Sequence, residues 1–308
     1  MSYDVDPKAL TELFIEKMGT DMEKTAAEAG AFVRMRLREL SFMRKIMNPT
    51  YVTAADCQRS VLHDQLVKIV DKEPDSTAYT MNFRGKANAT YVKGERYEIS
   101  FFLVGSEDFQ KTEEELLAYE MPITDVIEKN SVKDIQKVED TVFIQTISGI
   151  CDDNSKSRSL ATGISGITNP IPQLVFRTGF NLLESVSGND PLYTDLILMN
   201  QADYNKLIEW NSTQIGDQIA TEITTNGFTY PTLFGKKVIT TIKGALVPEN
   251  TLYFFAPKEY LGHAYILGDT KFWIEKRKNL VTWGAYEHIG VGIGNNNGVA
   301  RVTYSVLS

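Results

Sequence analysis

The stretch from Thr194 to Ser308 constrains the fold most, because short apolar strands alternate there with turns and helices. The run Leu196–Met199 is continuously apolar and is bounded by turn-forming residues, which is typical of a strand buried on both faces. A helix and further strands are expected after it: the helix at 201–210, and the strands at 232–241, 247–255 and 269–275. This mixture of elements predicts an α+β fold.

The N-terminal segment predicts two amphipathic helices. The first begins at Asp6, an N-cap residue followed by proline at the first helical position, and ends near Gly19. The second runs from about Asp21 to Met43, before the break at Pro49. Neither helix has an obvious partner in its own chain. The two therefore predict an arm that packs on neighbouring molecules.

The segment 64–105 predicts one long hairpin. The alternating run Leu66–Val70 enters it, and Tyr97–Val104 leaves it. The intervening Pro74–Gly94 is polar and rich in Gly, Asn and Thr, so it cannot build a core of its own. An isolated two-stranded ribbon is marginally stable in water, and this one is therefore expected to need a partner surface.

A long helix is predicted from Ile123 to Ile147, where apolar residues recur at helical spacing. Pro122 stands near its start, and Gly149 is expected just past its end. Residues 151–168 are rich in Ser, Gly and Asn and predict a connector, and 172–186 predicts another helix with several packing residues.

Composition limits the class of protein. A chain of 308 residues with 43% hydrophobic content can bury a large core, and a net charge of -8 argues against nucleic-acid binding by the whole chain. No apolar run approaches the roughly 18 residues that cross a bilayer, so no membrane partner is expected. The N-terminus lacks a signal-peptide pattern, and two distant cysteines predict a reducing compartment.

Motifs of catalysis and cofactor binding are missing from the sequence. The three histidines are far apart, and Cys57 and Cys151 lack neighbours that would activate a thiol. The glycine-rich run Gly290–Gly298 precedes a strand instead of a helix, which disfavours a dinucleotide site. No catalytic residue, cofactor or metal site is therefore predicted.

Basic residues cluster between positions 31 and 50, next to an acidic segment at 1–30. The cationic members are Arg34, Arg36, Arg38, Arg44 and Lys45. The plain interpretation is a solvated helix face. The alternatives are salt bridges between subunits, where complementary charge sets the register, and contact with DNA.

Aromatic residues stand out in the polar loop of the predicted hairpin. They are Tyr79, Phe83 and Tyr91. Rings in such a loop are candidate anchors on a partner surface, because anchors of this kind supply most of the binding free energy of an interface. The plain alternative is that they pack only against each other. These three residues and the five cations are the candidate inter-subunit contacts.

The order of elements from Asp195 to Glu275 resembles the axial domain of tailed-bacteriophage major capsid proteins with the Hong Kong 97-type fold. In that family, a strand ending in asparagine, here Asn200, leads into a helix. A Phe-Gly strand, a Pro-Glu-Asn turn, an aromatic strand and a Tyr-Leu-Gly turn then follow, as they do here up to Gly262.

The resemblance implies a division of the whole chain. An N-terminal helical arm is expected at 1–63 and an extended loop at 64–105. A peripheral domain with a spine helix is expected at 106–148 and 270–285. The axial domain is expected at 149–269 and 286–308.

The resemblance also implies a function. The protein is expected to self-assemble through pentamers and hexamers into an icosahedral virion capsid, built in the host cytoplasm, with packaged DNA on its inner face. The expected partners are a portal, a decoration protein and, because the chain starts at Met1 without a long leading segment, a separate scaffolding protein or none.

Two other functions stay open. An encapsulin-like bacterial compartment shares this fold but encloses a cargo enzyme. A soluble enzyme on an unfamiliar α+β scaffold would be a small oligomer with a pocket of convergent polar groups.

Overall fold

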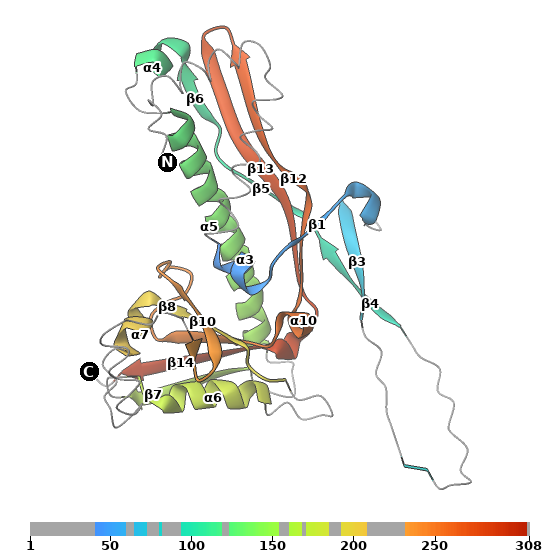
Figure 1. The fold of residues 1–308 in the computed structure, drawn as a ribbon, viewed down its shortest axis with the longest axis vertical. Helices are drawn as coiled ribbons and strands as arrows, with labels where there is room; N and C mark the ends of the chain where they lie inside the picture. Colours follow the sequence, from blue (N-terminus) through green and yellow to red (C-terminus); the bar gives the residue numbers. More distant parts are fainter. Residues whose placement is uncertain are drawn as a thin grey trace, which may run out of the picture.

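The computed structural model describes residues 41–59, 65–72, 80–81, 94–118, 123–153, 160–167, 171–184, 192–207 and 232–306. Within these ranges the strands form three sheets, which have five, six and three strands. The molecule is elongated, with the five-stranded sheet and a long helix along its length and the six-stranded sheet at one end (Figure 1). The α+β class expected from the sequence is confirmed.

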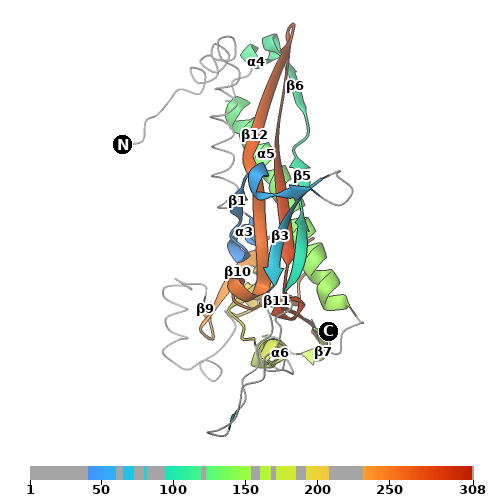
Figure 2. The same ribbon diagram turned by 90° about the vertical axis from the view of Figure 1, so that its right-hand side faces the viewer.

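The five-stranded sheet, called the long sheet below, is built on one long hairpin. Its strands are β1 (Thr50–Val52), β5 (Phe102–Gly105), β6 (Phe109–Thr112), β12 (Gly262–Arg277) and β13 (Leu280–Ile293). β12 and β13 pair antiparallel along most of their length, with an irregularity between Leu267 and Lys271. β1 adds in parallel to β12, while β5 and β6 pair with successive parts of β13. Figure 2 shows how far this hairpin extends along the molecule.

The six-stranded sheet has the order β7-β14-β11-β8-β10-β9. Its strands are β7 (Ala161–Ile167), β8 (Leu196–Asn200), β9 (Thr232–Leu233), β10 (Lys236–Thr241), β11 (Thr251–Phe255) and β14 (Val299–Val306). Every residue of β8 and β11 is buried. Alternate side chains of a strand point to opposite faces, so both faces of these central strands must be covered.

Two helices provide that cover. α6 (Gln173–Glu184) packs on the face that carries Ile197 and Phe254, and α5 (Ile123–Asp152) packs on the face that carries Leu198 and Phe255. α6 approaches closely because Gly179 lacks a side chain: a Cβ there would lie 2.2 Å from the Phe254 ring. The strand and the two helices expected in this region are confirmed.

α5 also packs on the long sheet, so it joins the two sheets. Its buried side chains Ile135, Phe143 and Ile147 belong to one apolar cluster with residues of both sheets. The helix does not end before Gly149, as the sequence predicted, but continues to Asp152. Its last residue is held there, since Asp152 accepts hydrogen bonds from the guanidinium of Arg301 in β14.

The three-stranded sheet, called the ribbon below, projects sideways from the body in Figure 1. It consists of β2 (Gln58–Arg59), β3 (Leu66–Lys72) and β4 (Glu95–Ser100). β3 and β4 pair antiparallel from Val67↔Ser100 to Lys72↔Glu95. The predicted pairing of β3 with β4 is confirmed, but the second strand, expected at Tyr97–Val104, leaves the hairpin after Ser100, because β5 pairs with β13 instead. Most of the polar loop lies outside the described residues.

Short helices complete the described fold. They are α3 (Phe42–Ile46), η1 (Ala54–Asp56), α4 (Glu113–Ala118), α7 (Gln201–Lys206), α10 (Lys258–Leu261) and η3 (Asn296–Gly298). α7 follows β8 as predicted, because the Asn200 side chain caps it by accepting a hydrogen bond from the Ala202 N–H.

Two predicted elements are wrong. The helix expected to run through Met43 is interrupted, because Ser41 is extended and its hydroxyl caps α3 by accepting a hydrogen bond from the Arg44 N–H. The connector expected at 151–168 contains β7, which pairs in parallel with β14 and is thus specified by a distant strand instead of its own composition. The first expected helix and the part of the second before residue 41 lie outside the described residues.

Candidate functional site

The ribbon is the largest described element that has little core of its own. Only Val67 and Ile99 of its three strands are fully buried. Its exposed surface carries cross-strand ion pairs, with Lys72 Nζ 2.7 Å from Glu95 and Arg96 Nε 2.8 Å from Asp71. Such exposed pairs contribute little to stability. The ribbon is therefore fixed to the body at its root, and the rest of it is available for contact.

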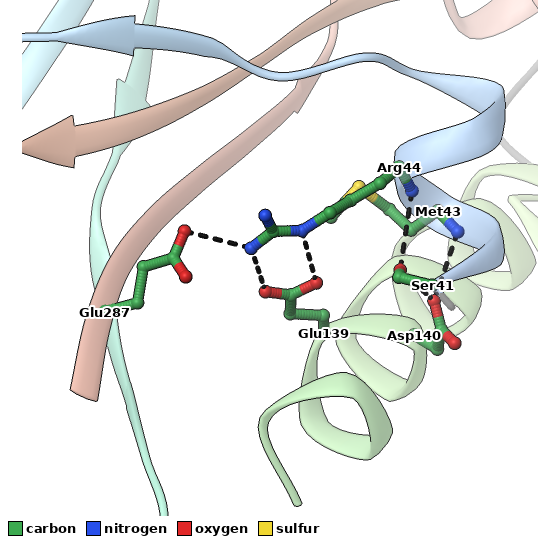
Figure 3. A network of polar contacts seen from close by, with 6 residues as sticks. All are labelled: Ser41, Met43, Arg44, Glu139, Asp140 and Glu287. Carbon is green, nitrogen blue, oxygen red and sulfur yellow. Dashed lines mark hydrogen bonds and ion pairs between the residues drawn. The ribbon is translucent and has the colours of Figure 1, made fainter. Parts of the chain in front are cut away.

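A second feature lies inside the subunit, where α3, α5, β13 and the turn after β10 meet. We call it the junction cluster, and its members are Ser41, Arg44, Glu139, Asp140, Lys243 and Glu287. In Figure 3 the guanidinium of Arg44 lies between two carboxylates: Nε and Nη2 donate to Glu139 at 3.0 and 2.6 Å, and Nη2 donates to Glu287 at 2.9 Å. All three side chains are at most 1% exposed.

Asp140, the next residue of α5, holds the other side of the same segment. One carboxylate oxygen accepts hydrogen bonds from the Ser41 hydroxyl at 2.8 Å and the Met43 N–H at 3.1 Å. The other oxygen accepts from Lys243 Nζ at 2.6 Å. Glu139 and Asp140 thus bind α3 to α5. Arg44 of α3 also binds the long sheet through Glu287, and Asp140 binds Lys243 in the turn after β10 of the six-stranded sheet.

Burial and charge act in opposite directions on this cluster. Burial raises the pKa of Glu139 to about 7, although the hydrogen bonds and the charge of Arg44 oppose the rise. Burial alone would lower the pKa of Arg44, but Glu139 and Glu287 together hold it above its ordinary value. The guanidinium of Arg44 therefore stays charged, and Glu139 is the member of this pair whose protonation changes near neutral pH.

The structure corrects one of the expected inter-subunit contacts. Arg44 is buried and ion-paired within its own chain, because both carboxylates that it needs come from α5 and β13. It therefore cannot face a neighbour or DNA. Lys45, the next residue, is exposed. The other candidates lie outside the described residues: Arg34, Arg36, Arg38, Tyr79, Phe83 and Tyr91.

The sequence held a signal for the junction cluster that composition alone did not reveal. Ile135, Glu139, Phe143 and Ile147 form one i, i+4 stripe of α5, and all four are buried. An acidic residue within an apolar stripe predicts a buried cation partner, because an unpaired buried carboxylate is strongly disfavoured. The identity of that cation could not be read from the stripe.

The described residues show no arrangement for metal chemistry. No group of three or more His, Cys, Asp or Glu side chains could hold a metal ion among them. Cys57 and Cys151 are not joined in a disulfide, and burial raises the pKa of the Cys57 thiol. None of the described helices is both long enough and apolar enough to cross a bilayer.

No protein-family model and no curated protein matches the sequence. Solved structures match its fold. A chain of the mature capsid of bacteriophage PhiM1 aligns with a TM-score of 0.56 and 9% identity, over 87% of this chain and 88% of that chain. A capsid chain of the native GTA particle aligns with a TM-score of 0.57 and 10% identity, over 85% of this chain and 89% of that one.

A virus-like particle from Pyrococcus furiosus has a similar fold as well. Its chain aligns with a TM-score of 0.51 and 14% identity, over 90% of this chain and 98% of that chain. At these identities the comparisons establish the fold, and the likeness to phage capsid proteins expected from residues 195–275 is confirmed at that level.

Proposed function

We propose that this protein is the major capsid protein of a tailed bacteriophage, which self-assembles into an icosahedral shell around packaged double-stranded DNA. The main support for this proposal is the fold, which is shared with the PhiM1 and GTA capsid chains over 87% and 85% of this chain. A closed shell requires each copy to contact its neighbours through several surfaces in repeated geometry.

The ribbon supports this function independently of the comparisons. It projects from the body, and only its root is buried. A strand pair of this kind gains stability by packing on another surface. In a shell, that surface is an adjacent copy of the same chain, and Tyr79, Phe83 and Tyr91 stay our candidate anchors there.

In this proposal the chain divides into four parts. Residues 1–63 form the arm and 64–105 the extended loop. The peripheral domain contains α5, β6, β12 and β13, to which β1 of the arm and β5 of the extended loop add as strands, and the axial domain contains the six-stranded sheet with α6. The sequence placed 106–148 and 270–285 in the peripheral domain. We propose to extend the second range to 262–293, because β12 and β13 pair from Gly262↔Ile293 to Arg277↔Leu280.

The partners follow from the same role. The protein binds copies of itself in pentamers and hexamers, and it works with a portal and a separate scaffolding protein. Its inner face meets DNA, and Lys45 stays a candidate for contact with a neighbour or with DNA. We propose that it is a structural protein of the virion and not an enzyme.

One observation favours a second candidate function. The structural alignment with the virus-like particle from Pyrococcus furiosus covers 98% of that particle's chain. We therefore keep the encapsulin-like compartment expected from the sequence, a shell that encloses a cargo enzyme in place of DNA, as the alternative.

Expression of the full chain, followed by electron microscopy and analysis of the particle contents, tests both functions. Closed icosahedral particles that package DNA in the presence of a portal are the expected result. Particles that hold a co-purifying enzyme and no DNA would establish the compartment instead. Monomers or small oligomers only, with scaffold present, would overturn both.

A further inference from the structure

The glycines at the end of β13 form a smooth track on one face of the long sheet. Gly290 and Gly292 are alternate residues of β13, and Gly294 follows the strand. Alternate residues of a strand point to the same face, so these positions present only backbone there. This glycine-rich run had no evident role in the sequence.

The space above the track is filled by the root of the ribbon. A Cβ at Gly292 would lie 2.5 Å from the Ile99 side chain, and a Cβ at Gly294 would lie 2.7 Å from the Tyr97 hydroxyl. At Gly290 the nearest atoms would be a methyl group of Ile99 at 3.0 Å and the Ser100 carbonyl oxygen at 3.2 Å. Ile99 is only 2% exposed. β4 therefore sits where side chains of β13 would otherwise stand.

The chain path explains why the root is placed there. β5 pairs with β13 at the sheet edge, as far as Phe102↔Ile289. One residue earlier, at the buried Phe101, the chain leaves that edge, and β4 lies over the face of β13. Tyr265, which pairs with Gly290 from β12, borders the track, and burial together with Tyr265 raises the pKa of Tyr97.

We propose that Gly290, Gly292 and Gly294 are positioning residues that fix the direction in which the ribbon leaves the subunit, and thereby decide which part of a neighbouring copy it reaches. The second clause rests on the proposed function. Contacts at Tyr97 and Ile99 are two residues apart, about 7 Å along the strand. A 1 Å displacement at one of them would tilt the ribbon enough to move a point about 20 Å away by about 3 Å.

The test uses the full chain with the substitution Gly292→Ala, whose new methyl overlaps Ile99. The matched control is Gly105→Ala in β5 of the same sheet, where the nearest atom to the new Cβ is 3.7 Å away. Ile99→Ala is made alone and combined with Gly292→Ala. Unfolding of the unassembled subunit, and particle size and yield by sedimentation and electron microscopy, are measured for each variant.

We expect Gly292→Ala to keep a cooperative unfolding transition but to form roughly tenfold fewer closed shells, or shells of altered diameter. Gly105→Ala should assemble normally. The double variant should form more normal shells than Gly292→Ala, because Ile99→Ala removes the overlapping atoms. Normal assembly of Gly292→Ala, or a double variant no better than Gly292→Ala, would overturn the positioning role.

Failure of the proposed shell function can be distinguished from failure of the role assigned to the glycines. If the natural sequence forms no shells, hydrogen exchange on the subunit still tests the track. Amides of β3 and β4 should then lose protection in Gly292→Ala and regain it in the double variant. Unchanged protection in Gly292→Ala would refute the track itself.

Discussion

Replacing Arg44 with methionine should strongly destabilise the subunit. Methionine fills much of the same volume, so the effect comes from charge and hydrogen bonding and not from a cavity. The substitution removes three hydrogen bonds and leaves Glu139 and Glu287 facing each other, both fully buried.

The magnitude follows from what those carboxyls can do. The variant can avoid a buried unpaired charge by protonating the carboxyl. For a carboxyl with an ordinary pKa near 4.3, protonation at pH 7 costs about 3.7 kcal/mol, so the destabilisation from that group cannot exceed this value. Removing one partner of a buried ion pair typically destabilises a protein by about 3–5 kcal/mol. We therefore expect Arg44→Met to lower the free energy of unfolding by about 3–5 kcal/mol at neutral pH.

The loss should depend on pH, because both buried carboxyls must be neutral in the variant, whereas in the natural protein Arg44 balances the charge of one of them and only Glu139 holds a proton below about pH 7. The variant's deficit should shrink as the pH falls from 8 to 5, by up to about 1.4 kcal/mol per unit for each additional proton. Urea unfolding of the unassembled subunit, followed by tryptophan fluorescence at pH 5, 7 and 8, measures it.

Two further variants make this prediction specific. Lys45→Met changes the exposed neighbour and should stay within about 0.5 kcal/mol of the natural protein. Adding Glu287→Gln to Arg44→Met should recover part of the loss. A deficit below about 1 kcal/mol at pH 8, or an equal deficit at pH 5 and 8, would refute the role assigned to the buried charges.

Three other outcomes are expected. The folded protein holds a proton on Glu139 up to about pH 7 that the unfolded chain loses near pH 4.5, so stability should fall as the pH rises between these values, and Glu139→Gln should flatten this dependence in urea titrations. Gly179→Ala should lower the melting temperature sharply, because its Cβ would lie 2.2 Å from the Phe254 ring. Asp203→Asn should destabilise by about 1–3 kcal/mol in chemical unfolding, because Asp203 is fully buried and accepts hydrogen bonds from Lys206, Tyr304 and the Asn250 N–H.

Two of these have a matched comparison. Gly163→Ala in β7, where the nearest atom to the new Cβ is 3.5 Å away, should melt close to the natural protein. Lys206→Met removes one of the three hydrogen-bond donors to Asp203 and leaves the other two. It should therefore lower the free energy of unfolding less than Asp203→Asn does. A Glu139→Gln variant with the same pH dependence as the natural protein would show that another group controls it.

Local pattern was sufficient for some of this fold. The apolar run of β8, the cap at Asn200 and the i, i+4 spacing of α5 each specify their element without help from distant residues. β7 was missed because its strand character depends on pairing with β14 far along the chain. The end of α5 was placed too early because Gly149 stops a helix only when tertiary contacts do not continue it.

The candidate contact sites divide in the same way into those that local pattern predicts and those that it does not. The pairing of β3 with β4 in the ribbon was predictable, because a polar loop between alternating strands is a local signal. The fate of Arg44 was not, because Glu139 and Glu287 lie 95 and 243 residues away in sequence. A cluster of cations in the sequence suggests a single charged surface. Folding instead buries Arg44 inside the subunit and leaves Lys45 exposed.

The strand order of the six-stranded sheet has a consequence for synthesis of the protein. β14 lies between β7 and β11, yet it leaves the ribosome after every other described element. Until it arrives, β7 has no described partner strand and one edge of β11 stays open. An incomplete chain therefore cannot close this sheet, and the proposed shell would have a means of excluding prematurely terminated copies.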